Sequence, residues 1–242
     1  MNYCVVAVQR TGSTLLNRYV YERNNEFGNS EFFLDRHVLN RDNTHSVNFN
    51  TREVTLENVI RKFEYLENLK SRGIYYPIKI IPKNVIHFGD EIENRFKLYL
   101  KDFKVLTILR NPFDSYLSRS FQDSIDWKVS HNKKDSGYSE LKPTQFSPLI
   151  TPENFIKQWL NESRFIFDIN PHHIFKYEDI NTKYLNNYFG FTINNSMKPM
   201  NINYKNLVIN YNKVYDDFHF VLERKMKNWK NVFGVNPYNE DL

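Results

Sequence analysis

Residues 5–16 decide the fold; they are Val5-Val6-Ala7-Val8-Gln9-Arg10-Thr11-Gly12-Ser13-Thr14-Leu15-Leu16. An apolar run of strand length meets a hydroxyl-rich turn that holds one arginine and one glycine, and an amphipathic helix follows at once. In such a turn, hydroxyls and successive backbone N–H groups lie at the helix N-terminus, where unpaired donors and the helix dipole favour an anion. The stretch therefore predicts a phosphate-binding loop between a buried strand and a helix.

This turn departs from the Walker A pattern of ATP-binding enzymes, G-x-x-x-x-G-K-[ST]. Gly12 and Thr14 fit the pattern, but Ala7 stands at its first glycine and Ser13 at its lysine. The cation is instead Arg10, two residues before the glycine. An ATP-dependent enzyme without the lysine would lose its contact to the outer phosphates, so the loop predicts a different anion. A turn in which Ser and Thr merely cap a helix is the structural alternative.

The segment from residue 9 to residue 16 resembles the 5′-phosphosulfate loop of sulfotransferases that use 3′-phosphoadenosine 5′-phosphosulfate (PAPS). In that family a Lys or Arg precedes [ST]-G-[ST]-[ST]. The resemblance implies that Arg10 binds the 5′-phosphosulfate and stabilises the leaving group. It also implies that the same phosphate accepts hydrogen bonds from Thr11, Gly12, Ser13 and Thr14.

A second motif follows the apolar run at residues 104–109, which predicts a buried parallel strand. Arg110 ends this strand and a helix opens near residue 113, which resembles the family's 3′-phosphate motif of an Arg and a Ser eight residues later. Arg110 and Ser118 match that motif, with Ser115 as the second choice. Arg offers phosphate a planar fork of donors, and a helical Ser adds a neutral donor. Simple pairing of Arg110 with Asp114 is the structural alternative.

The catalytic base requires a separate argument. Cytosolic aryl and steroid sulfotransferases end their second major strand in Lys-Thr-His, and this His is the catalytic base. Here Lys79 is retained, but Ile81 stands at the position of the His. A histidine base at that position is therefore excluded. Residues 28–33 resemble the Gly-x-Pro-x-Glu-Phe-Phe segment of bacterial trehalose sulfotransferases, one residue shorter and without the Pro. This resemblance makes Glu31 the candidate base and points to a carbohydrate acceptor. The retained Lys79 is expected near the sulfonate oxygens. A surface Glu and a solvated strand-end Lys are the alternatives.

Residues 173–180 resemble the late strand of the same family, which commonly ends in Tyr-Glu-Asp-Leu, and we assign them a scaffold role. Asp179 is the predicted N-cap of the next helix. The adjacent His172 and His173 point to opposite faces of an extended segment, and no carboxylate or Cys cluster completes a site. No metal cofactor is expected.

Composition and net charge limit the classes of protein to which the chain can belong. With 242 residues, 40% hydrophobic and 16% aromatic, the chain predicts one globular domain over residues 1–242. A net charge of +5 suits an enzyme that holds a polyanionic nucleotide, and equally nucleic acid or an anionic surface. No RNA- or DNA-binding motif appears, so no nucleic-acid partner is expected.

Cellular location follows from three absences in the sequence. Cys4 is the single cysteine, which excludes an intramolecular disulfide and favours a reducing compartment. No segment approaches the roughly 18 to 20 apolar residues of a membrane span. The first strand begins near residue 3, without room for a signal peptide, so a cytoplasmic protein is expected. Acceptor identity and oligomeric state are not encoded in any motif.

Strands and helices alternate along the chain, which predicts a doubly wound α/β fold with a parallel sheet and ligands beyond the carboxyl ends of its strands. Residues 34–54 are expected to be loop-like, and residues 128–150 to form a lid or substrate loop. The predicted strands cover residues 3–8, 74–81, 104–109 and 173–178, and the predicted helices cover residues 13–24, 84–100, 113–127, 180–189 and 205–230. Thr55 is the predicted cap of a further helix that Gly73 stops, and another helix starts with Thr151 as its cap and Pro152 in its first turn.

Together these features predict a sulfotransferase with PAPS as donor, adenosine 3′,5′-bisphosphate (PAP) as product and a small-molecule or glycan hydroxyl as acceptor. Two alternatives stay open. One is a P-loop phosphotransferase that uses ATP and magnesium, against which the missing Walker lysine and the Arg110 and Ser118 motif argue. The other is a non-catalytic protein that binds nucleotide or nucleic acid.

Overall fold

The computed structural model describes residues 2–8, 11–24, 32–33, 37–39, 46–48, 54–76, 78–124, 146, 148–192 and 204–233. The chain divides into two compact units, Met1–Leu109 with Arg164–Pro199 and Arg110–Ser163 with Met200–Leu242, and each is described by itself. Most of the predicted lid, residues 128–150, lies outside the described residues. No helix in the described part of the chain has the length and apolar character needed to cross a membrane.

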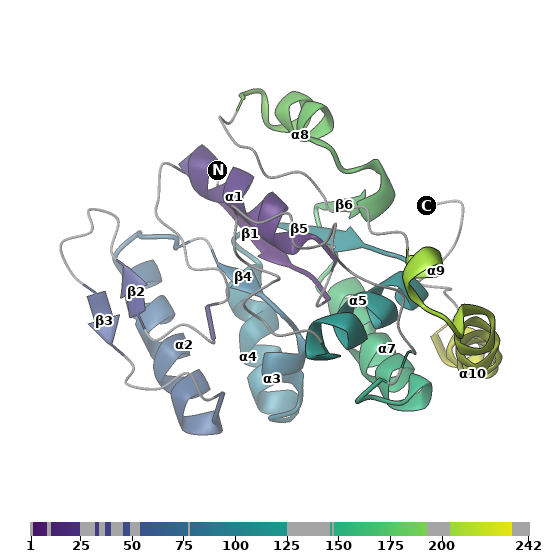
Figure 1. Ribbon diagram of the computed structural model, residues 1–242. Helices are drawn as coiled ribbons and strands as arrows, with labels where there is room; N and C mark the ends of the chain where they lie inside the picture. Colours follow the sequence, from purple (N-terminus) through teal and green to yellow (C-terminus); the bar gives the residue numbers. More distant parts are fainter. Residues whose placement is uncertain are drawn as a thin grey trace. The chain divides into compact units, whose positions relative to one another are not determined.

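The first unit is built on a parallel sheet (Figure 1). Its strands are β1 (Tyr3–Val6), β4 (Lys79–Ile80), β5 (Lys104–Leu109) and β6 (His173–Lys176), in the order β4-β1-β5-β6. Every neighbouring pair is parallel, which confirms the predicted α/β class. The carboxyl ends of β1, β4 and β5 therefore meet at one edge of the sheet, and the predicted anion loop follows β1 at that edge.

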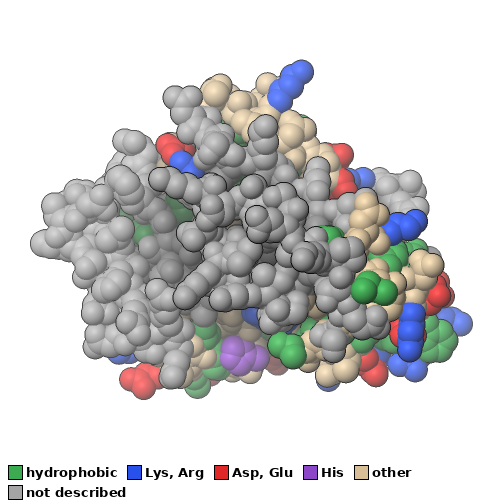
Figure 2. All heavy atoms as spheres, in the orientation of Figure 1, with side chains coloured by type: hydrophobic (Ala, Val, Ile, Leu, Met, Phe, Trp, Pro, Cys, Tyr) green, Lys and Arg blue, Asp and Glu red, His purple; other side chains and the backbone are tan. Residues whose placement is uncertain are grey.

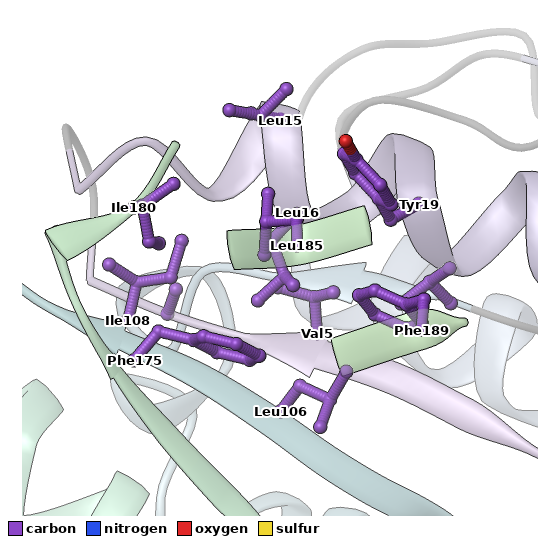
Figure 3. Packing of buried hydrophobic residues seen from close by; sticks show 12 residues of the cluster. Val5, Leu15, Leu16, Tyr19, Leu106, Ile108, Phe175, Ile180, Leu185 and Phe189 are labelled. Carbon is purple, nitrogen blue, oxygen red and sulfur yellow. The ribbon is translucent and has the colours of Figure 1, made fainter. Parts of the chain in front are cut away.

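Helices cover both faces of this sheet. Val5 and Ala7 project into a core with α1 (Ser13–Asn24) and α8 (Thr182–Phe189), and Figure 3 shows Val5 among side chains of these two helices. Cys4 and Val6 point to the opposite face and are also fully buried. Burial, and then the neighbouring Cys4, raise the pKa of the Tyr99 hydroxyl of α4 (Asp90–Leu100) there. Figure 1 shows α1 and α8 on one side of the sheet and α3 (Lys83–Ile86) and α4 on the other, as a doubly wound fold requires.

Local signals place most helix ends where the sequence predicts them. Thr55 caps α2 (Leu56–Ser71) through its side-chain oxygen, and Gly73 follows the helix with a φ of 75°. Thr151 caps α7 (Pro152–Asp168) in the same way. Asn111 caps α5 (Pro112–Ser124), with a proline in the first helical position. Short-range hydrogen bonds of this kind need no tertiary contact, so sequence alone locates them.

Several elements differ from the prediction. The expected helix at 84–100 is divided into α3 (Lys83–Ile86) and α4, because Gly89 between them has a φ of 96°, which no helix accommodates. The strand expected at 74–81 is limited to Lys79–Ile80, the part that pairs with β1. The stretch at 34–54 is not all loop, since β2 (His37–Leu39) and β3 (Ser46–Asn48) pair in antiparallel fashion.

The predicted cap of α8 is wrong. Tyr177–Asp179 form the 3₁₀ turn η2, and Asn181 then accepts the Tyr184 amide at 2.9 Å. The extra turn moves the helix start two residues beyond Asp179, whose carbonyl accepts from the Asn181 side chain instead. Asn and Asp are equally good caps, so the choice between them depends on the turn.

The second unit consists of α5, the first part of α7, α9 (Tyr204–Leu207) and α10 (Tyr211–Phe233). The helix expected at 205–230 is thus a short helix and a long one. Phe218 is fully buried at its centre, with ring centroids 5.2 Å from Phe113, 5.1 Å from Tyr116 and 6.1 Å from Phe155. This aromatic contact packs α5, α7 and α10 together.

Candidate functional site

Thr11 belongs to the predicted anion loop, which lies between β1 and α1. Its Oγ1 donates to the carbonyl of Val8 at 2.7 Å, and the side chain is buried. The hydroxyl proton is therefore used in a hydrogen bond that links Val8, shortly after β1, to Thr11, shortly before α1. Arg10, the predicted cation of this loop, lies outside the described residues.

Gly12 is required in this turn for two independent reasons. Its φ of +77° belongs to the left-handed region, which side chains disfavour. A Cβ at this position would also lie 2.8 Å and 2.9 Å from two ring carbons of Tyr177 in η2. The Gly12 carbonyl accepts the Leu15 amide at 3.0 Å, so the glycine directly precedes the first turn of α1.

The first residues of α1 present donors at the carboxyl edge of the sheet. Ser13 is buried and Thr14 is exposed. The first amides of any α-helix have no partner within the helix, and they carry the positive end of its dipole. The turn and the start of α1 therefore suit an anion chemically.

Lys79 brings a cation to this loop from the neighbouring strand. It pairs in register with Val5 of β1, and only 3% of its surface is exposed. Its Nζ donates to Thr14 Oγ1 at 3.2 Å, across 65 positions of sequence. Two residues that the sequence proposes separately, on a loop and on a strand, are thus in direct contact.

The segment that follows the candidate base is fixed beside Lys79. Glu31 itself lies outside the described residues, but the Phe32 amide next to it donates to the Lys79 carbonyl at 3.2 Å. Lys62 Nζ of α2 donates to the carbonyls of Phe32 and Phe33 at 2.9 Å and 2.7 Å. Sequence reasoning missed Lys62. The available signal was its position in the apolar stripe of α2, where Val59, Phe63 and Leu66 are buried.

The residues predicted for the 3′-phosphate belong to the second unit. Arg110 follows β5 directly and is buried. Ser118 and the second choice, Ser115, are buried in α5. The cap by Asn111 explains why a helix starts just after the arginine.

Arg224 and Lys225 of α10 and His173 of β6 have partners outside the predicted anion loop. On α10, Arg224 and Lys225 lie 3.5 Å and 2.9 Å from the Glu153 carboxylate of α7, and the hydrogen bond from Lys225 lowers the pKa of that carboxyl. Figure 2 shows basic and acidic side chains interspersed over this helix. Burial, and then the charge of His172, lowers the pKa of His173. Among the described residues, no group of three His, Cys, Asp or Glu side chains could hold a metal ion.

Comparison with known proteins gives little further information. No protein-family model and no curated protein matches the sequence. A crystal structure of a sulfotransferase from Alicyclobacillus acidocaldarius aligns with 95% of this chain and 98% of its own, at 15% identity and a TM-score of 0.40. A likeness of this size carries no assignment of function, which has to be argued from the site itself.

Proposed function

We propose that this protein is a sulfotransferase that moves the sulfuryl group from PAPS to a hydroxyl acceptor and releases PAP. The contact between Lys79 Nζ and Thr14 Oγ1 carries the proposal, because it places a buried ammonium group at the N-terminal turn of α1. A buried cation beside a turn of amide donors fits a doubly charged phosphosulfate. The loop and strand motifs that resemble PAPS-dependent enzymes support the same donor.

Each residue has a distinct part in the proposed transfer. Glu31 takes the proton of the acceptor hydroxyl while that oxygen forms its bond to sulfur in line with the leaving oxygen. Lys79 and Arg10 stabilise the sulfonate oxygens and the charge that develops on the leaving 5′-phosphate as the sulfur–oxygen bond breaks. Arg110 and Ser118 recognise the 3′-phosphate. Catalysis then comes from positioning and electrostatics, as in phosphoryl transfer.

The source of the cation argues against ATP as the donor. In a Walker A loop the lysine directly precedes the hydroxyl residue of the helix start, and it reaches the outer phosphates of a triphosphate. Here that position holds Ser13, whose side chain is buried, and the ammonium comes from β4. The proposed acceptor is a carbohydrate hydroxyl, on the ground of the segment around Glu31.

Calorimetric titration of three nucleotides tests the proposal. PAP, ATP with magnesium, and adenosine 5′-monophosphate are titrated into the full chain under the same conditions. We expect PAP to bind tightly without magnesium, and at least about tenfold more tightly than the monophosphate, since a charge-assisted phosphate contact contributes about 1.5–3 kcal/mol. Preference for ATP with magnesium would establish the phosphotransferase alternative. Tight PAP binding without any sulfated acceptor would favour the non-catalytic binder.

A further inference from the structure

Lys62 is a buried lysine outside the predicted site. It lies in α2, and only 1% of its surface is exposed. Its Nζ donates to two consecutive carbonyls, those of Phe32 and Phe33, about thirty residues earlier in the chain. It also lies 5.8 Å from the centroid of the Phe32 ring. Burial of an ammonium group is unfavourable unless hydrogen bonds compensate it, and these two carbonyls supply two such hydrogen bonds.

The two carbonyls need an unusual partner because of the backbone around them. Successive carbonyls of an extended strand point to opposite sides, so one donor cannot bind both. At Phe32 and Phe33 the chain turns, and both carbonyls face the same ammonium. Both residues are almost fully buried, which leaves water unable to replace Lys62. Without it, two buried acceptors would lack this donor.

Two further contacts fix the same segment. The Phe32 amide donates to the carbonyl of Lys79, the residue whose side chain reaches the anion loop. The Phe33 ring lies 5.6 Å from the rings of both Phe63 and Phe96, between α2 and α4. Lys62 thus supplies one anchor of a segment whose opposite side is bonded to β4.

We propose that Lys62 is a positioning residue that holds Phe32 and Phe33 against β4, and that the proposed base Glu31, which directly precedes them in the chain, depends on this anchor for its part in the reaction. The inference deepens the proposed function and rests on it. Lys62 acts through the backbone of its neighbours and touches neither donor nor acceptor. Its loss should therefore affect turnover and leave the binding of the nucleotide intact.

The test compares Lys62→Met with Leu66→Ala, which removes a fully buried side chain one turn further along the same helix. Methionine keeps the length of the side chain but donates no hydrogen bond. Three quantities are measured: amide hydrogen exchange at Phe32, Kd for PAP, and turnover of PAPS to PAP in water and with a panel of sugars. Lys62→Arg, which keeps the charge and the donors, serves as the rescue variant, and Lys62→Gln replaces Lys62→Met if the latter does not fold.

We expect exchange at Phe32 to rise by about tenfold or more in Lys62→Met relative to Leu66→Ala, while exchange at Leu15 in α1 changes equally in both variants. Turnover should fall by about tenfold or more with Kd for PAP changed by less than about twofold, and Lys62→Arg should recover part of the turnover. Equal exchange and equal turnover in Lys62→Met and Leu66→Ala would overturn the proposal. Failure of the wild-type chain to bind PAP would instead refute the proposed function, and exchange alone would then decide whether Lys62 anchors the segment.

Discussion

Replacement of Gly12 by alanine is the sharpest structural test of the anion loop. The substitution forces a side chain into a φ of +77°, which costs about 1–2 kcal/mol. It also places a Cβ 2.8 Å from the Tyr177 ring, an overpacking that costs about 1–3 kcal/mol. We therefore expect Gly12→Ala to lower the free energy of unfolding by roughly 2–5 kcal/mol.

Gly73 provides the matched control. Its φ of +75° is nearly the same, but a Cβ there would meet no atom within 4 Å. Gly73→Ala should thus show the backbone cost alone, and the difference between the two variants isolates the contact with Tyr177. Any gain from restricting the unfolded chain applies to both substitutions and cancels in this difference.

Urea denaturation of five proteins measures these quantities: the wild type, Gly12→Ala, Gly73→Ala, Tyr177→Ala and the double variant with both Gly12→Ala and Tyr177→Ala. If the ring is responsible, Gly12→Ala in the Tyr177→Ala background should cost no more than Gly73→Ala, and the coupling energy should be about 1–3 kcal/mol. A Gly12→Ala variant as stable as Gly73→Ala would refute the argument that the Tyr177 ring leaves no space for a Cβ at residue 12. Weaker binding of PAP should accompany the loss of stability.

Four further predictions concern single residues. Lys79→Met should lower PAPS turnover by about 100-fold, because it removes a donor to the transferring group, as steady-state kinetics will show; unchanged turnover would exclude Lys79 from the site. Arg110→Ala should weaken PAP by about 10- to 100-fold in calorimetry while the affinity for adenosine 5′-monophosphate stays the same; an equal loss for both nucleotides would contradict a 3′-phosphate contact. Glu31→Gln should reduce kcat by about 100-fold with Kd for PAP unchanged, and normal turnover would show that another group is the base. Burial opposes ionisation of Glu93, but hydrogen bonds from Lys97 and Arg164 outweigh it and lower the pKa of this carboxyl below 4.5, its ordinary value. The stability that the ionised carboxylate contributes is therefore present above that pH and is lost as the pH falls through the lower pKa of the folded state. Glu93→Gln should destabilise the protein to urea at neutral pH and make its stability less dependent on pH in the acid range.

The sequence by itself determined the elements whose signals are local. The apolar run before Thr11, the caps at Thr55 and Thr151, and the stop at Gly73 depend on neighbours within a few residues, and the structure confirms all of them. Alternation of such strands and helices is sufficient for a parallel α/β class. Where the local signal was ambiguous, as with Asp179 and Asn181, the cap prediction was wrong.

Only the tertiary structure decided which distant residues meet. Register between β1 and β4 brings the Lys79 ammonium to Thr14, and no pattern along the chain specifies that pairing. The same is true of the Tyr177 ring, which lies close to Gly12, and of the hydrogen bonds that Lys62 donates to the carbonyls of Phe32 and Phe33. Helical and strand periodicity is a property of short segments, whereas these contacts depend on how buried surfaces pack across the fold. The sequence thus indicates which residue types the loop offers to an anion, and the packing of the sheet and its helices determines which distant side chains contact the loop.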